Sequence, residues 1–587
     1  MSTLAGQLDA FARVSLVDFE FRALNGSRPD VVCMVVRDYR SGEVRRYWRN
    51  EIANFRECPF PVGPTDAMVA FYASAELGCM LELGWRLPSS VIDLFPEHRV
   101  QTNGLQLPAG NGLLGALAWR GLARIDVAAK DAMRDKVLYQ SSWSETEQAE
   151  ILAYCESDVD ALAILLNAMS PTLDLPRALL RGRYMAAIAK MERTGIPIDT
   201  ELRQSFVDGW RRARVELVKT VDADYGVYDG LRFKRGRFDE FLRVHGIPWP
   251  RTDAGFLKLD DETFKEQSLV WPVLKQLREL RQALTSMHLP DLPVGPDGRN
   301  RTLLAPFASK TGRNQPSAKR FAFGLAAWQR GIIRPPEGWG LAYVDFSSQE
   351  IAIAAGLSGD VGLIDAYESG DPYLAFGQRA GFVPAGATRE SHTRVRDVCK
   401  TVVLGLNYGL GAERMAYQAG IAPVQATELI QRHRIAYPRY WRWSEDTVTS
   451  ALLSNEMTSL FGWRRTIGSL DRPTSLMNFP MQANGAEMMR AAAIAATEAG
   501  IAVCAPVHDA FLIAAPIEQL DHDVERMRQL MAMAGRVVTG GINIRTDAKV
   551  VRYPDRYMDE RGLDMWNRVV NLIDRPDAVC RLPSIAW

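Results

Sequence analysis

Residues 341–350 read LAYVDFSSQE, and this stretch decides how the rest of the chain is interpreted. A short apolar run ends at Asp345, and a helical pattern begins after Ser348. A carboxylate at the end of a buried strand, beside a Ser-capped helix start, has a fixed position suited to holding a metal ion. The alternative is that Asp345 only helps to cap the helix. The stretch therefore predicts an α/β unit with a candidate metal ligand between strand and helix.

A second candidate ligand lies near the C-terminal end of the chain. Residues 501–507 and 510–515 are apolar runs that flank His508 and Asp509. This pattern predicts a β-hairpin with the polar pair at its tip, although an ordinary turn aspartate is the alternative. Two carboxylates from distant positions could hold two Mg²⁺ ions, which stabilise the attacking and leaving oxygens of phosphoryl transfer.

Residues 394–409, RVRDVCKTVVLGLNYG, contain a stripe of side chains spaced four apart. The stripe comprises Arg396, Lys400, Leu404 and Tyr408. On a helix these side chains share one face, and Gly409 would end the helix. Two cations one helical turn apart repel each other, so an anionic ligand between them would be favourable. A stripe of two cations followed by an aromatic ring therefore suits a ligand with a triphosphate and a base. A solvated basic face is the alternative, but it would not require Tyr408 on the same line.

The first 170 residues or so have an α/β pattern, with apolar runs at 15–21 and 31–37 around the Asn25-Gly26 turn signal. Helical patterns are expected around 65–84, 111–122 and 145–168. Within the first run, Asp18 and Glu20 share one face of a strand. Further along, Tyr154 and Asp158 lie one helical turn apart. A surface strand without a functional role is the alternative for the first pair.

Composition limits the class of protein. At 587 residues, three to five structural units are expected. Lys and Arg (70) balance Asp and Glu (70), so any DNA contact must come from locally clustered cations. Seven scattered cysteines without a CxxC pair fit a reducing cytoplasm better than a disulfide framework. We expect no signal peptide and no membrane span.

Together the three C-terminal elements resemble motifs A, B and C of family A DNA polymerases, in the correct order. Residues 345–350 (DFSSQE) resemble motif A, 396–409 resemble motif B, and 507–510 (VHDA) resemble motif C. Residues 311–313 (TGR) and 478–482 (NFPMQ) resemble two further segments that contact the primer–template.

The resemblance implies a role for each matching residue. Asp345 and Asp509 would hold two Mg²⁺ ions, for which Mn²⁺ can substitute, with His508 beside them. Arg396 and Lys400 would bind the incoming triphosphate. The remaining matches would contact the nucleotide and the nascent base pair: Glu350, which would exclude a 2′-hydroxyl, Leu404, Tyr408, which would stack near the templating base, and Arg313, Asn478 and Gln482 at the minor groove.

The N-terminal pattern resembles the Exo I and Exo III motifs of DEDDy 3′→5′ exonucleases. Three carboxylates would hold two metal ions: Asp18, Glu20 and Asp158. Tyr154 would orient the attacking water. For the middle motif the best candidate is Glu76 in residues 72–76 (YASAE), one methylene longer than the usual Asp. The alternative is a weakened site whose domain mainly positions DNA.

Two residues depart from the polymerase pattern. Leu404 stands where the family has Phe or Tyr, which puts the handling of chain terminators in doubt. Ala510 replaces the Glu that usually follows the motif C aspartate. Because two metal carboxylates remain, we expect activity to survive with altered support for the metal or the primer end.

The expected fold class is a multidomain α/β protein: an RNase H-like exonuclease domain followed by a right-hand polymerase domain. The expected boundaries are 1–172 for the exonuclease and 173–587 for the polymerase, with the thumb at about 190–290, the palm at about 291–360 and 455–587, and the fingers at about 361–454. The resemblance implies primer-directed DNA synthesis with dNTPs and 3′→5′ proofreading. Because Asp18 lies almost at the start, no 5′ nuclease is expected.

By analogy, the chain looks like a phage replicative or repair polymerase, acting as a monomer on primer–template DNA in the cytoplasm of a bacterial host. A single-subunit RNA polymerase shares the palm chemistry, but Glu350 and the exonuclease motifs argue against it. A catalytically inactive DNA-binding scaffold would have no use for paired metal carboxylates. A nuclease alone would leave most of the chain unexplained.

Overall fold

The computed structural model describes residues 8–122 and 127–573. Two compact units divide the chain. The first unit comprises residues 1–195, 301–316 and 340–550, and the second comprises 196–300, 317–339 and 551–587. The domain boundaries expected from the sequence are drawn differently from these units and stay predictions.

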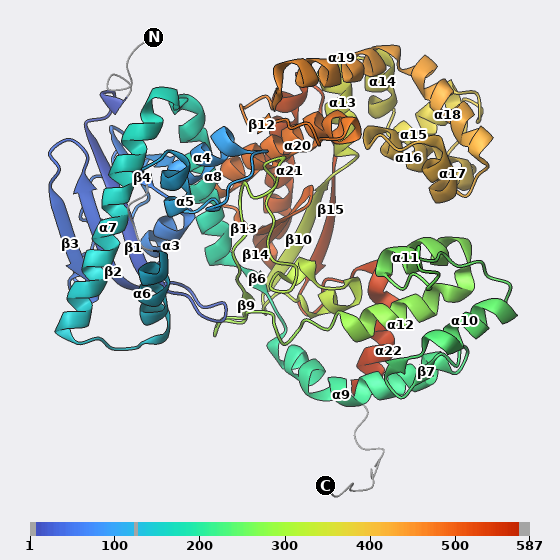
Figure 1. Cartoon of the computed structure of the whole chain (residues 1–587), viewed down its shortest axis with the longest axis horizontal. Helices are drawn as coiled ribbons and strands as arrows, with labels where there is room; N and C mark the ends of the chain where they lie inside the picture. The colour runs from blue at the N-terminus through green and yellow to red at the C-terminus, as the bar shows by residue number, and fades with distance from the viewer. Residues whose placement is uncertain (1–7, 123–126, 574–587) are drawn as a thin grey trace, which may run out of the picture. The chain divides into compact units, whose positions relative to one another are not determined.

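Five strands near the N-terminus form a mixed sheet in the order β3-β2-β1-β4-β5 (Figure 1). The strands are β1 (Arg13–Arg22), β2 (Asp30–Asp38), β3 (Val44–Trp48), β4 (Asp66–Ala70) and β5 (Ser90–Asp93). The two apolar runs expected around Asn25-Gly26 form β1 and β2, which pair antiparallel, and β1 also pairs parallel with β4. The helix expected around 65–84 is wrong in its first part. Met68 and Val69 lie fully buried in β4, between β1 and β5, and only the residues after them turn helical.

Helices cover this sheet and connect it to the rest of the first unit. They are α2 (Arg49–Ile52), α3 (Ser74–Glu82), α4 (Leu94–Thr102), α5 (Leu113–Trp119), α6 (Val127–Tyr139), α7 (Glu145–Met169) and α8 (Leu175–Thr194). α7 begins with a capping box in which Ser144 and Glu147 exchange hydrogen bonds. It packs on β1 and β2 through fully buried residues such as Leu16 and Leu165. The helix that carries Tyr154 and Asp158 therefore lies against the strand that carries Asp18.

A second sheet in the first unit has the order β13-β14-β10-β15. Its strands are β10 (Trp339–Phe346), β13 (Ala502–Val507), β14 (Ala510–Pro516) and β15 (Thr546–Arg552), and the helices α13 (Gln349–Ser358), α20 (Pro473–Glu498) and α21 (Ile517–Thr539) pack with it. Val507 pairs with Ala510, so His508 and Asp509 form a two-residue turn. The predicted hairpin is confirmed.

The predicted stripe lies on one of the six helices between α13 and the next strand of the chain. These are α14 (Val361–Glu368), α15 (Pro372–Arg379), α16 (Thr393–Asn407), α17 (Ala412–Ala419), α18 (Pro423–Ala436) and α19 (Pro438–Ser454), after which β11 (Glu456–Thr458) pairs with β12 (Arg464–Thr466). α16 confirms the predicted helix. Gly409 follows it with φ +66°, and a Cβ there would lie 2.6 Å from Cγ2 of Thr474.

The second unit is mainly helical. It contains α9 (Thr200–Asp222), α10 (Arg235–Val244), α11 (Asp261–Val270), α12 (Lys275–Thr285) and α22 (Leu563–Ile573), with the short pairs β6 (Ile196–Pro197) with β9 (Arg299–Asn300) and β7 (Tyr228–Asp229) with β8 (Arg232–Phe233). The rings of Phe206 and Trp566 lie 5.2 Å apart where α22 packs on α9. Across both units, no described helix combines the length and apolarity needed to cross a bilayer.

Candidate functional site

Two carboxylates meet where the hairpin tip adjoins β10. The amide of Phe346 donates to the carbonyl of Asp509 at 3.1 Å, which ties the end of the strand to the turn. Burial and the nearby carboxylates of Asp509 and Asp547 raise the pKa of Asp345 to about 7. Among the described residues, Oδ1 of Asp345 is buried without a hydrogen-bond partner. A buried carboxylate oxygen with an open position, beside a second carboxylate, fits a divalent cation bound by oxygen ligands.

The third carboxylate, Asp547, was missed by the sequence reasoning. It lies on β15, next to β10 in the sheet, and accepts a hydrogen bond from Oγ of Ser347 at 2.6 Å. Ala510, which replaces the usual acidic residue, is fully buried and offers no ligand atom. No local spacing marks Asp547, because only the order of strands brings it beside Asp345.

The stripe on α16 presents its two cations to one aromatic ring. The guanidinium carbon of Arg396 lies 5.4 Å from the ring centre of Tyr373, and Nζ of Lys400 lies 5.8 Å from it. Arg396 also donates a hydrogen bond to the carboxylate of Asp371, which caps α15. The Tyr373 hydroxyl lies 3.4 Å from Oγ of Ser348, three residues after Asp345. Tyr373 therefore connects the two cations to the end of β10 that carries Asp345. The sequence reasoning missed both Tyr373 and Asp371.

A hydrogen-bonded group surrounds Glu350 on α13. The Tyr408 hydroxyl donates to Oε1 of Glu350 at 2.8 Å, and the Gln482 amide donates to the same carboxylate and, at 3.0 Å, to Tyr408. Burial raises the pKa of Glu350, and the positive charge of Arg313 partly offsets this. The structure thus brings together four residues predicted to contact the nucleotide.

The other predicted residues of this region lie around that group. Asn478, one helical turn before Gln482 on α20, donates from Nδ2 to the carbonyl of Asn407 at 3.1 Å. Leu404 is half-buried on α16, one turn before Tyr408. His508 is exposed at the hairpin tip, with φ +57°.

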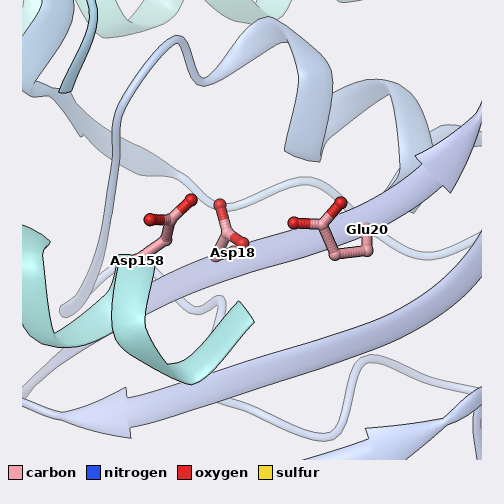
Figure 2. Close-up of side chains that lie close together, drawn as sticks. All are labelled: Asp18, Glu20 and Asp158. Atoms are coloured by element: carbon pink, nitrogen blue, oxygen red, sulfur yellow. The ribbon is translucent and has the colours of Figure 1, made fainter. Parts of the chain in front are cut away.

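The N-terminal carboxylates form a compact group. Figure 2 shows Asp18 and Glu20 on one strand and Asp158 on a helix, with their carboxylates pointing toward one another. One carboxylate oxygen from each residue lies within 4.8 Å of the others, a spacing that can accommodate a cation. The group arises because strand alternation places Asp18 and Glu20 on the face that α7 covers.

Glu76 and Tyr154 lie close to this group. Glu76 is only 4% exposed, and its pKa is raised well above the usual value by burial and by the negative charges of Asp18 and two other acids. Burial and the three carboxylates also raise the pKa of Tyr154, so its hydroxyl keeps its proton. The Cys155 thiol, another residue missed from the sequence, donates to Oδ2 of Asp18 at 3.2 Å.

Comparison with known proteins agrees with the C-terminal geometry. Residues 311–552 match the family model described as DNA polymerase family A. This part of the chain is therefore similar to family A DNA polymerases. The match contains every residue of the C-terminal site described above, whereas the family A polymerase model leaves the N-terminal carboxylates outside it.

Proteins similar to this chain include DNA polymerase I of Chloroflexus aurantiacus, 25% identical over 69% of this chain and 47% of the relative. The DNA polymerase of Mycobacterium phage D29 is 24% identical over 72% of this chain and 71% of its own length. The chain spans less than half the length of the bacterial relatives it matches first. In fold it resembles the POL domain of Pol1 from M. smegmatis, solved with DNA primer-template and dNTP (TM-score 0.67, 19% identity, covering 93% of this chain and 96% of that one).

Proposed function

We propose that the chain extends a DNA primer along a template, using dNTPs. The primer 3′-hydroxyl attacks the α-phosphorus of the nucleotide, and pyrophosphate leaves. The observation that carries this proposal is the placement of Asp345 and Asp509 together at one end of β10, with the cations of Arg396 and Lys400 connected to the same strand end through Tyr373.

Asp345 and Asp509 are the residues that would hold two Mg²⁺ ions, or Mn²⁺ in their place. When bound, such ions stabilise the attacking and leaving oxygens. Arg396 and Lys400 bind the triphosphate and offset the charge that develops on the leaving pyrophosphate. Tyr373 keeps both cations on one side of α16 before the nucleotide arrives.

Nucleotide selection falls to the group around Glu350. Because Tyr408 and Gln482 hold the Glu350 carboxylate, it forms a rigid wall beneath the sugar that excludes a 2′-hydroxyl. Tyr408 is 47% exposed, so its ring can stack near the templating base. Arg313, Asn478 and Gln482 contact minor-groove acceptors, whose pattern is shared between pairs and therefore reports pair shape rather than sequence.

We further propose that the N-terminal carboxylates remove nucleotides from the primer 3′ end by hydrolysis. Asp18, Glu20 and Asp158 would hold the metal ions, and Tyr154 would orient the attacking water. Glu76, buried beside these carboxylates, would add a fourth carboxylate to the metal site. The similarity to a phage DNA polymerase supports a phage-type polymerase. We propose that it acts as a monomer on primer–template DNA.

Primer extension tests the proposal. The purified chain receives a 5′-overhang duplex and Mg²⁺, with dNTPs, with rNTPs, or with neither. We expect extension with dNTPs and shortening without nucleotides. Extension with rNTPs at equal efficiency would favour an RNA polymerase, and no extension with either would favour a DNA-binding scaffold. Asp345→Asn should abolish extension, whereas Asp365→Asn, an exposed carboxylate paired with Arg379, should not.

A further inference from the structure

Helix α4, beside the N-terminal sheet, ends against two segments that belong to the polymerase region. The side chain of Asn103, at the end of α4, is only 1% exposed, and its Nδ2 donates to the carbonyls of Lys310 at 2.7 Å and Arg464 at 2.8 Å. The Asn103 carbonyl accepts from the amide of Thr466 at 2.8 Å. At Gly104, with φ +94°, a Cβ would lie 2.1 Å from the Thr466 carbonyl oxygen. The contact therefore requires both the amide and the glycine that follows it.

Arg99, one turn earlier on α4, donates hydrogen bonds to the same segment. Its Nε donates to the carbonyl of Phe307 at 3.3 Å, and its Nη2 donates to the carbonyl of Ala308 at 3.2 Å. Two side chains of one helix thus satisfy three backbone carbonyls within residues 307–310. Backbone carbonyls buried at such a contact need these donors, because an unpaired polar group away from water is costly.

The segment held by α4 leads directly to Arg313. Oγ of Ser309 accepts from the Arg313 amide at 2.8 Å, and the Ser309 amide donates to the Arg313 carbonyl at 3.2 Å. The Trp463 indole donates to the Lys310 carbonyl at 3.0 Å, and Nη1 of Arg490 donates to the Gly312 carbonyl at 2.7 Å. The loop that fixes the backbone of Arg313 is therefore itself hydrogen-bonded to Arg99 and Asn103.

We propose that Asn103 and Arg99 are positioning residues of the polymerase site. They hold the loop of residues 307–313 so that Arg313 reaches the minor groove of the primer–template. This inference rests on the function proposed above. A small displacement of a group that aligns the substrate strongly lowers the reaction rate, because the reacting atoms must be held in a defined geometry. The helix beside the N-terminal sheet thus contributes to synthesis by a route that does not involve the carboxylates of the nuclease site.

A double-mutant cycle tests the proposal, with Asn103→Ala, Arg313→Ala and the double variant. The measured quantity is kcat/KM for a matched primer–template at saturating dNTP. Loss of the Asn103 amide should lower kcat/KM by about tenfold when Arg313 is present. When Arg313 is already alanine, the same change should lower it less than about twofold, because coupled residues are not additive.

Gln101→Ala is the matched control. It lies on the same helix, but its side chain bonds to Thr172 and Arg120 rather than to the loop, so it should leave kcat/KM unchanged. Equal losses in both Arg313 backgrounds, or no loss from Asn103→Ala, would overturn the proposal. If Asn103→Ala fails to fold by thermal melting, Arg99→Gln takes its place in the cycle.

The wild type, measured alongside, separates this inference from the proposed function. If it does not extend primers, the proposed function fails, and the same cycle is then run on equilibrium binding to the primer–template duplex. Coupling between Asn103 and Arg313 in binding supports the positioning role, and additivity overturns it.

Discussion

The two carboxylate groups of the first unit are assembled in different ways. The N-terminal group takes two members, Asp18 and Glu20, from the face of β1 that α7 covers, and one from α7 itself. The C-terminal group takes Asp345, Asp509 and Asp547 from the ends of separate strands and a hairpin turn. Strand alternation alone pairs Asp18 with Glu20, whereas only the order of strands brings Asp547 to Asp345. Local spacing reveals the first kind of site, and topology is needed for the second.

The two carboxylate groups have different neighbouring side chains, and each set of neighbours suits the reaction proposed for its group. Asp345 has paired cations nearby on α16, as transfer with a pyrophosphate leaving group requires. The N-terminal group has a protonated Tyr154 beside it, which suits the orientation of a water molecule. Replacing one carboxylate in either group by a neutral side chain should therefore leave the activity of the other group intact.

The largest expected effect is a crossed loss of activity. Asp509→Asn should lower primer extension by on the order of 10³-fold, because the metal site loses a charged ligand, and should leave shortening of the primer unchanged. Asp18→Asn should do the reverse. Both rates are measured on one labelled duplex, with and without dNTPs. Loss of both activities in either variant would mean that the two groups are not independent.

Glu350→Ala should reduce the preference for dNTP over rNTP by about 100-fold, equivalent to about 2.7 kcal/mol of lost steric exclusion. The measurement is kcat/KM for a dNTP and the matching rNTP on the same template. Glu368→Ala, on α14, serves as the control. An unchanged ratio would show that the Tyr408–Gln482 group does not fix the wall beneath the sugar.

Much of the C-terminal site could be predicted because its elements carry strong local patterns. The α16 stripe, the 508–509 turn and strand β10 each form where their periodicity places them. The prediction was wrong at 66–70, where a buried apolar strand resembles part of a helix when read alone. Tyr373 and Asp371 escaped because their contact with Arg396 depends on the packing of α15 against α16, which no spacing encodes.

A smaller effect concerns pH and the C-terminal group. Because the pKa of Asp345 is raised to about 7, binding of Mg²⁺ must displace a proton below that pH. The apparent Mg²⁺ affinity in primer extension should fall by up to about tenfold per pH unit below 7 and level off above it. Asp547→Asn removes one neighbouring negative charge, so the fall should begin at a lower pH. An affinity that does not vary between pH 6 and 8 would contradict this coupling.

The smallest effect is on the stability of the N-terminal group. The pKa of Glu76 is higher in the folded chain than in the unfolded one, so the folded state binds more protons. The stabilising contribution is complete below the unfolded pKa of about 4.3 and is lost as the pH rises through the folded value. In EDTA, the Tm of the wild type should therefore fall between pH 5 and 8. Other buried acids with raised pKa values, Asp93 and Glu192, add to that fall.

Glu76→Gln isolates the share due to Glu76, because the amide is neutral at every pH. The variant should show a shallower fall, by a few degrees, since about 1 kcal/mol moves Tm by about 2–4 °C in a domain of 150–250 residues. Glu145→Gln, an exposed position on α7, should keep the wild-type slope. Added Mg²⁺ should raise the wild-type Tm most at high pH, where it offsets the repulsion among the carboxylates. If Glu76→Gln melts with the wild-type slope, Glu76 is ionised in the folded chain, and the raised pKa of Glu76 is contradicted.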